Sequence, residues 1–331
     1  MSNPVIPRPR ESYHLEGEEG PERAFLGALA RGRLHHAWLL VGPEGVGKAT
    51  FAYRAARRLL GATPDPDYGV LGANPDDPVC RQIVGHAHSD LMVLEREADD
   101  GKPRKTIPVD EARALPEFFS KSPGQAAYRV AIIDTVDDLA SAGANAVLKT
   151  LEEPPERGVL FLVSHSPGAL LPTIRSRCRR LVFAPPPQAE ASLWLQRQAD
   201  VSEETALSLL RLARGAPGLA LRLAGAGALE IDEAARKLVA RLPVVDESAA
   251  LSLADGFRGA EGQARFALLM DRIGAALHER AAAAALDGRG ALDRWAEAWE
   301  LVSNLPGEAE AINLDRADAF FSALTRLKAL A

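Results

Sequence analysis

Short apolar runs alternate with stretches of helical periodicity through the first half of the chain. The runs are continuous rather than alternating, which is typical of strands that are covered on both faces of a sheet. We predict strands at residues 37–41, 91–94, 130–133 and 159–163, separated by helices at 48–60, 110–120 and 142–151. This order predicts an α/β domain built on an open parallel sheet with flanking helices.

The pattern changes after the prolines at 185–187, which are expected to end both strands and helices. From Glu190 onward Ala, Leu, Arg and Glu recur at helical spacing, and we expect no further long strand. Turn signals at 214–218 and at Leu242-Pro243 divide this half of the chain. We therefore predict an α/β domain at 1–186, a small helical domain at 187–243 and a C-terminal all-helical domain at 244–331.

A row of large apolar residues marks the last predicted domain. Leu292, Trp295, Trp299 and Val302 follow one another at intervals of three, four and three residues, which places them along one stripe of a helix. We expect this stripe to belong to a core or an interface rather than to a catalytic site.

Composition and charge limit the classes of protein that the chain can belong to. Its 331 residues exceed what one hydrophobic core usually organises, which agrees with several domains. The net charge of −6 gives no general attraction to nucleic acid, so contact with DNA phosphates would require a local basic cluster. Neither a secretory signal nor a membrane helix is recognisable, and we expect a cytoplasmic protein.

The two cysteines, Cys80 and Cys178, are too few for a disulfide framework, so we expect reduced thiols. Cys80 is expected in a loop near His86 and His88. Their spacing lacks the paired ligands of a structural zinc site. We therefore favour an ordinary surface loop over a metal site at this position.

A candidate phosphate loop runs from Gly42 to Lys48 between a predicted strand and a predicted helix, which is the context that such a loop requires. Gly42, Gly45 and Gly47 would allow backbone N–H groups to face phosphate oxygens. The start of the helix adds positive potential, and Lys48 adds a charge. A glycine-rich turn with a chance lysine is the less favoured alternative.

The residue after the lysine departs from a working loop. A serine or threonine there coordinates Mg²⁺ through its hydroxyl, but the chain has Ala49. Thr50 follows one position later, and on a helix this shift rotates the side chain by about 100°. We expect nucleotide to bind weakly, with the metal poorly held.

An acidic residue stands where a second Mg²⁺ contact is expected. The predicted strand at 130–133 leads into Asp134, at the carboxyl edge of the sheet. A hydrolytic site would also need a neighbouring glutamate to orient water, but Thr135 is next. Asp137 and Asp138 are expected to start a helix rather than to act in catalysis.

Three sequence runs together resemble the clamp-loader branch of the AAA+ ATPases. They are Arg-Leu-His-His-Ala-Trp at 33–38, Asn-Ala-Val-Leu-Lys-Thr-Leu-Glu-Glu-Pro-Pro at 145–155 and Leu-Pro-Thr-Ile-Arg-Ser-Arg-Cys at 171–178. The resemblance covers residues 33–183 and rests on weaker signals beyond them. It implies an AAA+ domain, then a small helical lid domain, then a C-terminal helical collar domain that joins a hetero-pentameric ring.

The resemblance also assigns roles to individual residues. The Ser-Arg-Cys element implies that Arg177 is an arginine finger reaching the ATP site of an adjacent subunit, rather than part of a solvated basic edge. The sensing arginine of the motor subunits corresponds to Gly218 here. The four-cysteine zinc module of those subunits has no counterpart, so no zinc is expected.

These departures at Ala49, Thr135 and Gly218 favour a non-motor (stator) subunit over an active ATPase. The implied partners are the clamp-loader ATPase (gamma/tau) subunits, a clamp-opening delta subunit, the sliding clamp and primer-template DNA, with no membrane. Any ATP or ADP would be bound weakly or structurally, and the chain alone is not expected to be catalytic. An active clamp-loader motor subunit or an AAA+ DNA-repair ATPase is the alternative that Lys48 and Asp134 support. A scaffold in which Arg177 is only a surface charge is a third.

Overall fold

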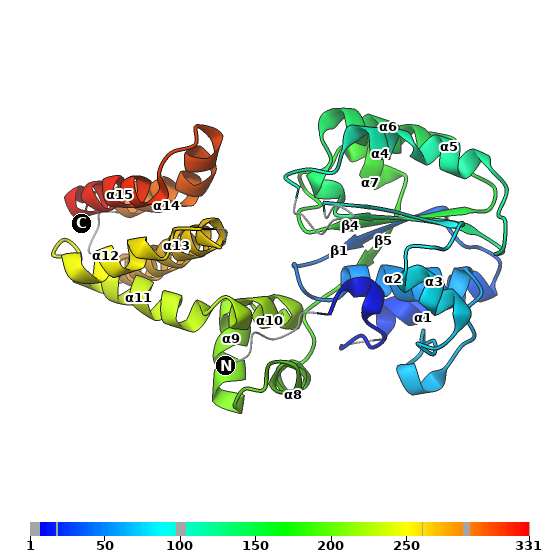
Figure 1. Cartoon of the computed structure of the whole chain (residues 1–331), viewed down its shortest axis with the longest axis horizontal. Coiled ribbons are helices and arrows are strands. Elements are labelled where there is room, and N and C mark those ends of the chain that lie inside the picture. Colours follow the sequence, from blue (N-terminus) through cyan, green and yellow to red (C-terminus); the bar gives the residue numbers. More distant parts are fainter. Residues whose placement is uncertain (1–6, 18, 97–103, 260, 287–291, 331) are drawn as a thin grey trace. The chain divides into compact units, whose positions relative to one another are not determined.

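The chain forms two compact units, Met1–Arg222 and Leu223–Ala331. The structure, a computed structural model, describes residues 7–17, 19–96, 104–259, 261–286 and 292–330 (Figure 1). Each unit is described by itself. No helix among these residues is long and apolar enough to cross a membrane.

A five-stranded parallel sheet forms the centre of the first unit, with strand order β2-β3-β4-β1-β5. Strands β1 to β4 match the four predicted strands to within one residue at each end. The prediction of an α/β domain with a parallel sheet is confirmed. A fifth strand, which was not predicted, pairs with β1 at the edge. The strands are β1 Ala37–Val41, β2 Leu91–Glu95, β3 Arg129–Asp134, β4 Gly158–Ser164 and β5 Arg179–Val182.

Helices cover both faces of this sheet (Figure 1). Alternate residues of each central strand face opposite sides, so Trp38 and Leu40 enter one core and Leu39 and Val41 enter the other. The first face carries α1 Gly20–Ala30, α2 Lys48–Leu59 and α3 Pro78–Val84. The second carries α4 Val109–Arg113, α5 Leu115–Ser120, α6 Ser141–Glu152 and α7 Pro172–Ser176.

Two expectations for this unit are corrected. The helix predicted at 110–120 is two helices that meet at Ala114, because Pro116 fits only the first turn of a new helix. Cys80 is not in a surface loop: it lies in α3 and is fully buried with Ala62 and Ala73. Three short 3-10 turns complete the unit, at Pro9–Glu11, Pro66–Tyr68 and Val136–Asp138.

Three further helices follow the prolines that were predicted to end the sheet. They are α8 Gln188–Ala199, α9 Glu203–Leu212 and α10 Pro217–Gly225. Ser202 caps α9 by accepting from the backbone N–H of Thr205. The predicted turn at 214–218 separates α9 from α10. We call α8 to α10 the lid helices.

The second unit is helical, as predicted. Its core is formed mainly by Leu, Ile, Ala and Phe side chains, with Phe257, Phe266 and Phe320 in edge-to-face contact. Its helices are α11 Ala228–Arg241, α12 Glu247–Asp255, α13 Gly262–Leu286, α14 Leu292–Ala311 and α15 Arg316–Leu330. The predicted break at Leu242-Pro243 falls directly after α11.

The predicted stripe on α14 is only partly in the core. Val302 is fully buried, and Trp295 packs against the core with the Arg280 guanidinium over its ring. Trp299 is half exposed. The side chain of Leu292 lies outside the described residues.

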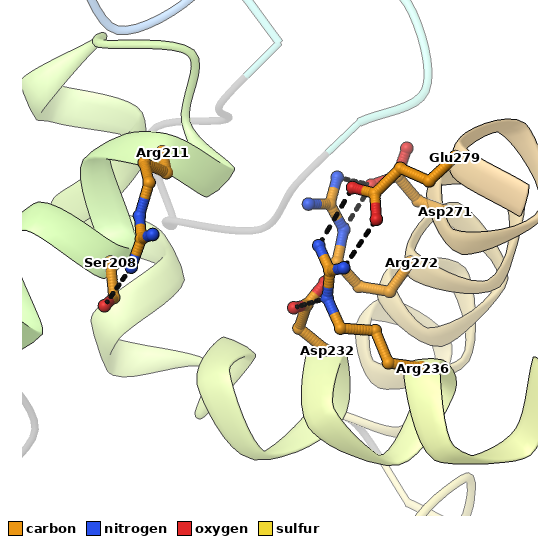
Figure 2. A network of polar contacts seen from close by, with 7 residues as sticks. All are labelled: Ser208, Arg211, Asp232, Arg236, Asp271, Arg272 and Glu279. Atoms are coloured by element: carbon orange, nitrogen blue, oxygen red, sulfur yellow. Dashed lines mark hydrogen bonds and ion pairs between the residues drawn. The ribbon is translucent and has the colours of Figure 1, made fainter. Parts of the chain in front are cut away.

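A charged network joins α11 to α13 on the surface of the second unit (Figure 2). Arg236 donates to Asp232 on its own helix and to both carboxylate oxygens of Glu279 on α13, at 2.5 and 3.0 Å. In α13 itself, Arg272 pairs with Asp271. Because these side chains are partly exposed, each pair contributes at most about 1 kcal/mol to stability. In the first unit, Arg211 donates to Ser208 within α9 (Figure 2).

Candidate functional site

The predicted phosphate loop connects β1 to α2. Gly45 and Gly47 have φ angles of +79° and +95°, a backbone conformation that side-chain-bearing residues rarely adopt. Gly47 in this conformation is the N-cap of α2, and Lys48 is its first residue. The strand, turn and helix therefore follow one another as the sequence predicted.

Lys48 is directed toward its own loop. Its ammonium nitrogen Nζ donates to the carbonyl oxygens of Gly42 and Pro43, at 2.6 and 2.5 Å. Burial lowers the pKa of Lys48 to about 8, although the nearby carboxylate of Asp134 opposes that shift. Two of the three N–H donors of this ammonium are thus bonded within the loop.

Ala49 and Thr50 form the first turn of α2 with Lys48. Both line the same cavity as Gly45, Gly47 and Lys48. Ala49 has no side-chain oxygen to offer a metal ion at the position after the lysine. No group of three or more His, Cys, Asp or Glu residues suited to a metal occurs anywhere in the described ranges, including around His86 and His88.

Asp134 ends β3 and lines this cavity. Burial and the neighbouring Glu95 raise its pKa to about 6, while Lys48 acts in the opposite direction. Thr135 donates its hydroxyl to Asp138 at 2.7 Å, so the residue that replaces the water-orienting glutamate is engaged within the loop. Asp138 also pairs with Arg96 at 2.9 Å.

Asp137 holds the end of β4 rather than the cavity. Its carboxylate accepts from the Ser164 hydroxyl at 2.8 Å and from the backbone N–H of His165 at 2.5 Å. Asp137 and Asp138 lie in a short 3-10 turn and do not start the following helix as expected, because α6 begins at Ser141. His165 lines the cavity, and burial together with Lys48 lowers its pKa.

The cavity has a volume of about 460 Å³ and is bounded by three parts of the first unit. The phosphate loop and the ends of β3 and β4 form one wall. The N-terminal segment contributes His14 and Leu15, and the lid helices contribute Trp194, Leu221 and Arg222. These are the residues that could contact a nucleotide.

The start of α10 lies directly on the phosphate loop. The backbone N–H of Gly218 donates to the carbonyl oxygen of Gly45 at 2.9 Å. A Cβ at Gly45 would be 2.2 Å from the backbone nitrogen of Leu219, and a Cβ at Gly218 would be 2.9 Å from the Gly45 oxygen. Neither glycine can therefore accept a side chain without movement of the backbone. Next to this contact, Arg222 pairs with Glu44 at 2.6 Å.

The N-terminal segment covers another part of the loop. A Cβ at Gly47 would be 2.2 Å from the Cδ1 atom of Leu15. Two buried arginines of α2 hold the preceding residues in place: Arg57 donates to the Ser12 carbonyl at 2.9 Å, and Arg54 donates to the Tyr13 carbonyl. Arg54 also pairs with buried Glu22 at 2.7 Å.

Arg177 is at the opposite edge of the sheet. It lies two residues before β5, whose first residue pairs with Trp38 near the start of β1, whereas the phosphate loop follows the end of β1. A five-residue strand spans roughly 15 Å at about 3.3 Å per residue. The guanidinium of Arg177 pairs with Glu152 at 3.2 Å and donates to the Thr173 carbonyl at 3.1 Å.

Most of the predicted site residues therefore come together, and one does not. The candidate nucleotide-binding residues surround one cavity or bond to its lysine: Gly42, Gly45, Gly47, Lys48, Ala49, Thr50 and Asp134. Arg177 lies near the opposite end of the strands, where β1 and β5 begin. Sequence reasoning missed Leu15, His165 and Arg222, which reach the cavity through tertiary packing and carry no local motif.

Comparison with known proteins identifies relatives of this chain. A family profile described as "DNA polymerase III, delta subunit" matches residues 18–187. The chain is 35% identical over 192 residues to the DNA polymerase III subunit delta' of Escherichia coli and 39% identical over 197 residues to that of Pseudomonas aeruginosa. These matches cover 58% and 59% of the chain, and 55% and 57% of the relatives' own length.

Other similarities are more distant. The chain is 34% identical over 181 residues to the DNA polymerase III subunit gamma/tau of Mycobacterium bovis, which covers 53% of the chain and 29% of that protein. Among solved structures, a DNA polymerase III gamma subunit-related protein from Thermotoga maritima is 18% identical with a TM-score of 0.45, covering 92% of this chain and 99% of that one. The RuvB Holliday junction branch migration motor of the same organism is 20% identical with a TM-score of 0.41, covering 77% and 75%.

Proposed function

The chain belongs to the DNA polymerase III delta subunit family, and from this premise we propose that it is a non-motor, delta'-type subunit of a clamp loader. In this role it donates an arginine to the ATP site of a neighbouring subunit while its own site hydrolyses little or no ATP. The observation that carries the proposal is the position of Arg177, at the edge of the sheet away from a phosphate loop that the lid helices already contact.

The chain's own cavity supports the passive half of this role. Ala49 offers no metal ligand, Thr135 is engaged with Asp138, and Gly218 has no room for an arginine side chain because its backbone lies on Gly45. Two of the three N–H donors of Lys48 are bonded to carbonyl oxygens of its own loop. Any ATP or ADP is therefore held weakly or structurally, and we propose no zinc and no other metal.

The position of Arg177 supports the active half. A guanidinium stabilises charge on a transferring phosphoryl group and can do so across an interface. Because Arg177 lies at the amino edge of the sheet, it is far from Lys48 of the same chain and would serve a phosphate group bound by another subunit. The adjacent Arg175, Arg179 and Arg180 give the same edge a local positive potential.

The partners follow from this role. They are the gamma/tau ATPase subunits, a clamp-opening delta subunit, the sliding clamp and primer-template DNA, within a hetero-pentameric ring in the cytoplasm. The ring loads the clamp onto primed DNA during replication. We keep the division expected from the sequence, with the AAA+ domain at 1–186, the lid domain at 187–243 and the collar domain that holds the ring together at 244–331. Of the predicted lid, α11 packs in the helical core of the second unit.

The second candidate is an active gamma/tau-like motor subunit or a related AAA+ DNA-repair ATPase. It is favoured by the observation that Lys48 and Asp134 line the same cavity. Purified chain with Mg²⁺ and ATP separates the two candidates, with Lys48→Ala as the control. Turnover that Lys48→Ala abolishes would establish the motor function and exclude ours.

The arginine role is tested in a reconstituted clamp loader. We expect Arg177→Ala to lower ATP turnover at the site it serves by about 10³-fold, the lower end of what arginine fingers contribute. Arg175→Ala, an exposed neighbour, is the matched control and should leave turnover unchanged. Size-exclusion chromatography verifies that the ring still assembles. Unchanged turnover in an assembled Arg177→Ala ring would exclude the arginine finger.

A further inference from the structure

A carboxylate from a different helix faces the Arg177 guanidinium. The Nη2 atom of Arg177 lies 3.2 Å from the Oε1 atom of Glu152, and its Nη1 atom donates to the Thr173 carbonyl at 3.1 Å. Thr173 belongs to α7, the helix that ends directly before Arg177. Glu152 is the last residue of α6. The guanidinium is thus contacted from two sides, by the helix that precedes Arg177 and by a neighbouring one.

The position of Glu152 is unfavourable without a cation. A carboxylate in the last turn of a helix faces the negative end of the helix dipole, where its own charge is destabilised. Lys149 is the only basic residue in the last turn of α6, and it does not pair with Glu152 in the structure. The guanidinium of Arg177 therefore supplies the positive charge that contacts this carboxylate directly.

The ion pair is specific to Arg177 among the four arginines at this edge. Arg179 places its guanidinium over the Trp38 ring, 5.0 Å from the ring centroid. Within the described ranges, neither Arg175 nor Arg180 makes an ion pair with a carboxylate. The one arginine that the Ser-Arg-Cys element singles out is also the one that has a carboxylate partner.

We propose that Glu152 is a positioning residue for Arg177. Its carboxylate orients the planar guanidinium so that N–H groups not bonded to Glu152 or Thr173 face the neighbouring subunit. The side chain is then ordered before the ring assembles, and less conformational freedom is lost when it meets a phosphate. This inference rests on the proposed function, because it gives Arg177 a task across an interface.

The pair is open enough to release or share the guanidinium. The side chains of Arg177 and Glu152 are 37% and 54% exposed, so water already competes with the contact. A doubly charged phosphate would attract the same guanidinium more strongly than one carboxylate does. Glu152 therefore affects how often the finger is correctly placed rather than the charge that it delivers.

The test compares Glu152→Gln with Glu153→Gln in the reconstituted loader. Glutamine keeps the shape of Glu152 and removes its charge, and Glu153 is the adjacent exposed glutamate, at the C-cap of α6. We expect Glu152→Gln to lower kcat for ATP about 3- to 10-fold with KM and ring assembly unchanged, as a small misplacement does. Glu153→Gln should match the unaltered protein, and Glu152→Asp should recover part of the loss.

Two outcomes separate this inference from the function on which it rests. If Arg177→Ala loses turnover and Glu152→Gln does not, the positioning role is overturned and the arginine finger stands. If Arg177→Ala leaves turnover unchanged, both fail.

In an Arg177→Ala background, Glu152→Gln should have no further effect on kcat, and a further loss would show that Glu152 acts independently of Arg177. Loss of assembly with normal turnover in the rings that form would make the pair merely structural and overturn the proposal.

Discussion

The contact between Gly218 and the phosphate loop makes a sharp prediction for Gly218→Ala. The new Cβ would be 2.9 Å from the Gly45 carbonyl oxygen and 3.3 Å from the Gly45 Cα, and both atoms belong to the backbone. Ordinary contacts of this kind are longer, so α10 and the loop would have to separate. That movement weakens the N–H to oxygen bond between Gly218 and Gly45, which is now 2.9 Å long.

The expected loss of stability combines two unfavourable contributions with one favourable contribution. Losing the hydrogen bond costs about 0.5–1.5 kcal/mol, and displacing packed backbone costs about 1–3 kcal/mol. Alanine favours helices over glycine by up to about 1 kcal/mol, which offsets part of the loss near the start of α10. We therefore expect Gly218→Ala to lower the free energy of unfolding by about 1–3 kcal/mol.

The assay uses the whole chain and a matched glycine. Gly20 is the first residue of α1, and a Cβ there would meet nothing within 4 Å, so Gly20→Ala should leave stability unchanged or raise it slightly. Urea unfolding measures the loss for the first unit, and hydrogen exchange of peptides spanning 42–48 and 215–222 locates it. Equal stability and equal exchange for the two variants would refute the reasoning.

Two further predictions concern buried charges in the first unit. Because the pKa of Asp134 rises from 3.8 to about 6 on folding, the folded protein binds more protons than the unfolded chain between those values, and stability should fall as pH rises from about 4 to about 6. Asp134→Asn should remove this fall in stability and should be more stable than the parent protein at pH 7 by about 1–3 kcal/mol. Urea unfolding at several pH values measures both effects. A pH profile of stability that Asp134→Asn leaves unaltered would contradict the prediction. Glu22→Ala leaves the buried Arg54 guanidinium without its carboxylate and should cost about 3–5 kcal/mol in thermal or urea unfolding. Glu22→Leu combined with Arg54→Met should recover only part of it, because the Tyr13 and Tyr68 carbonyl oxygens then lose their donor.

The central part of the fold was predictable because its signals are local. The continuous apolar runs at 37–41 and 159–163 mark buried strands, and glycines before Lys48 mark a turn that starts a helix. The edge strand β5 escaped prediction because it has four residues, of which Arg179, Arg180 and Val182 are exposed. Such a strand owes its conformation to pairing with β1 and carries no apolar run of its own.

The sequence predicted which residues meet at the ends of the strands, but not which residues enclose them. Lys48 and Asp134 follow from the strand ends that carry them. Leu15 and Arg222 reach the same cavity from opposite ends of the first unit, and no spacing in the sequence expresses that proximity. Gly218 shows the limit most clearly, because the sequence identifies a glycine there but only the structure shows that its backbone lies against the carbonyl oxygen of Gly45.

The separation of Arg177 and Lys48 to opposite edges of one parallel sheet gives the first unit a direction. Five strands run the same way, so the edge where they begin and the edge where they end are different surfaces with different chemistry. The contact proposed for Arg177 therefore uses a different surface from the one that carries Lys48, which is the geometry of a head-to-tail contact rather than of a two-fold one. Alterations confined to one edge should then act independently of alterations at the other, so each contact of the unit can be rebuilt without disturbing its counterpart.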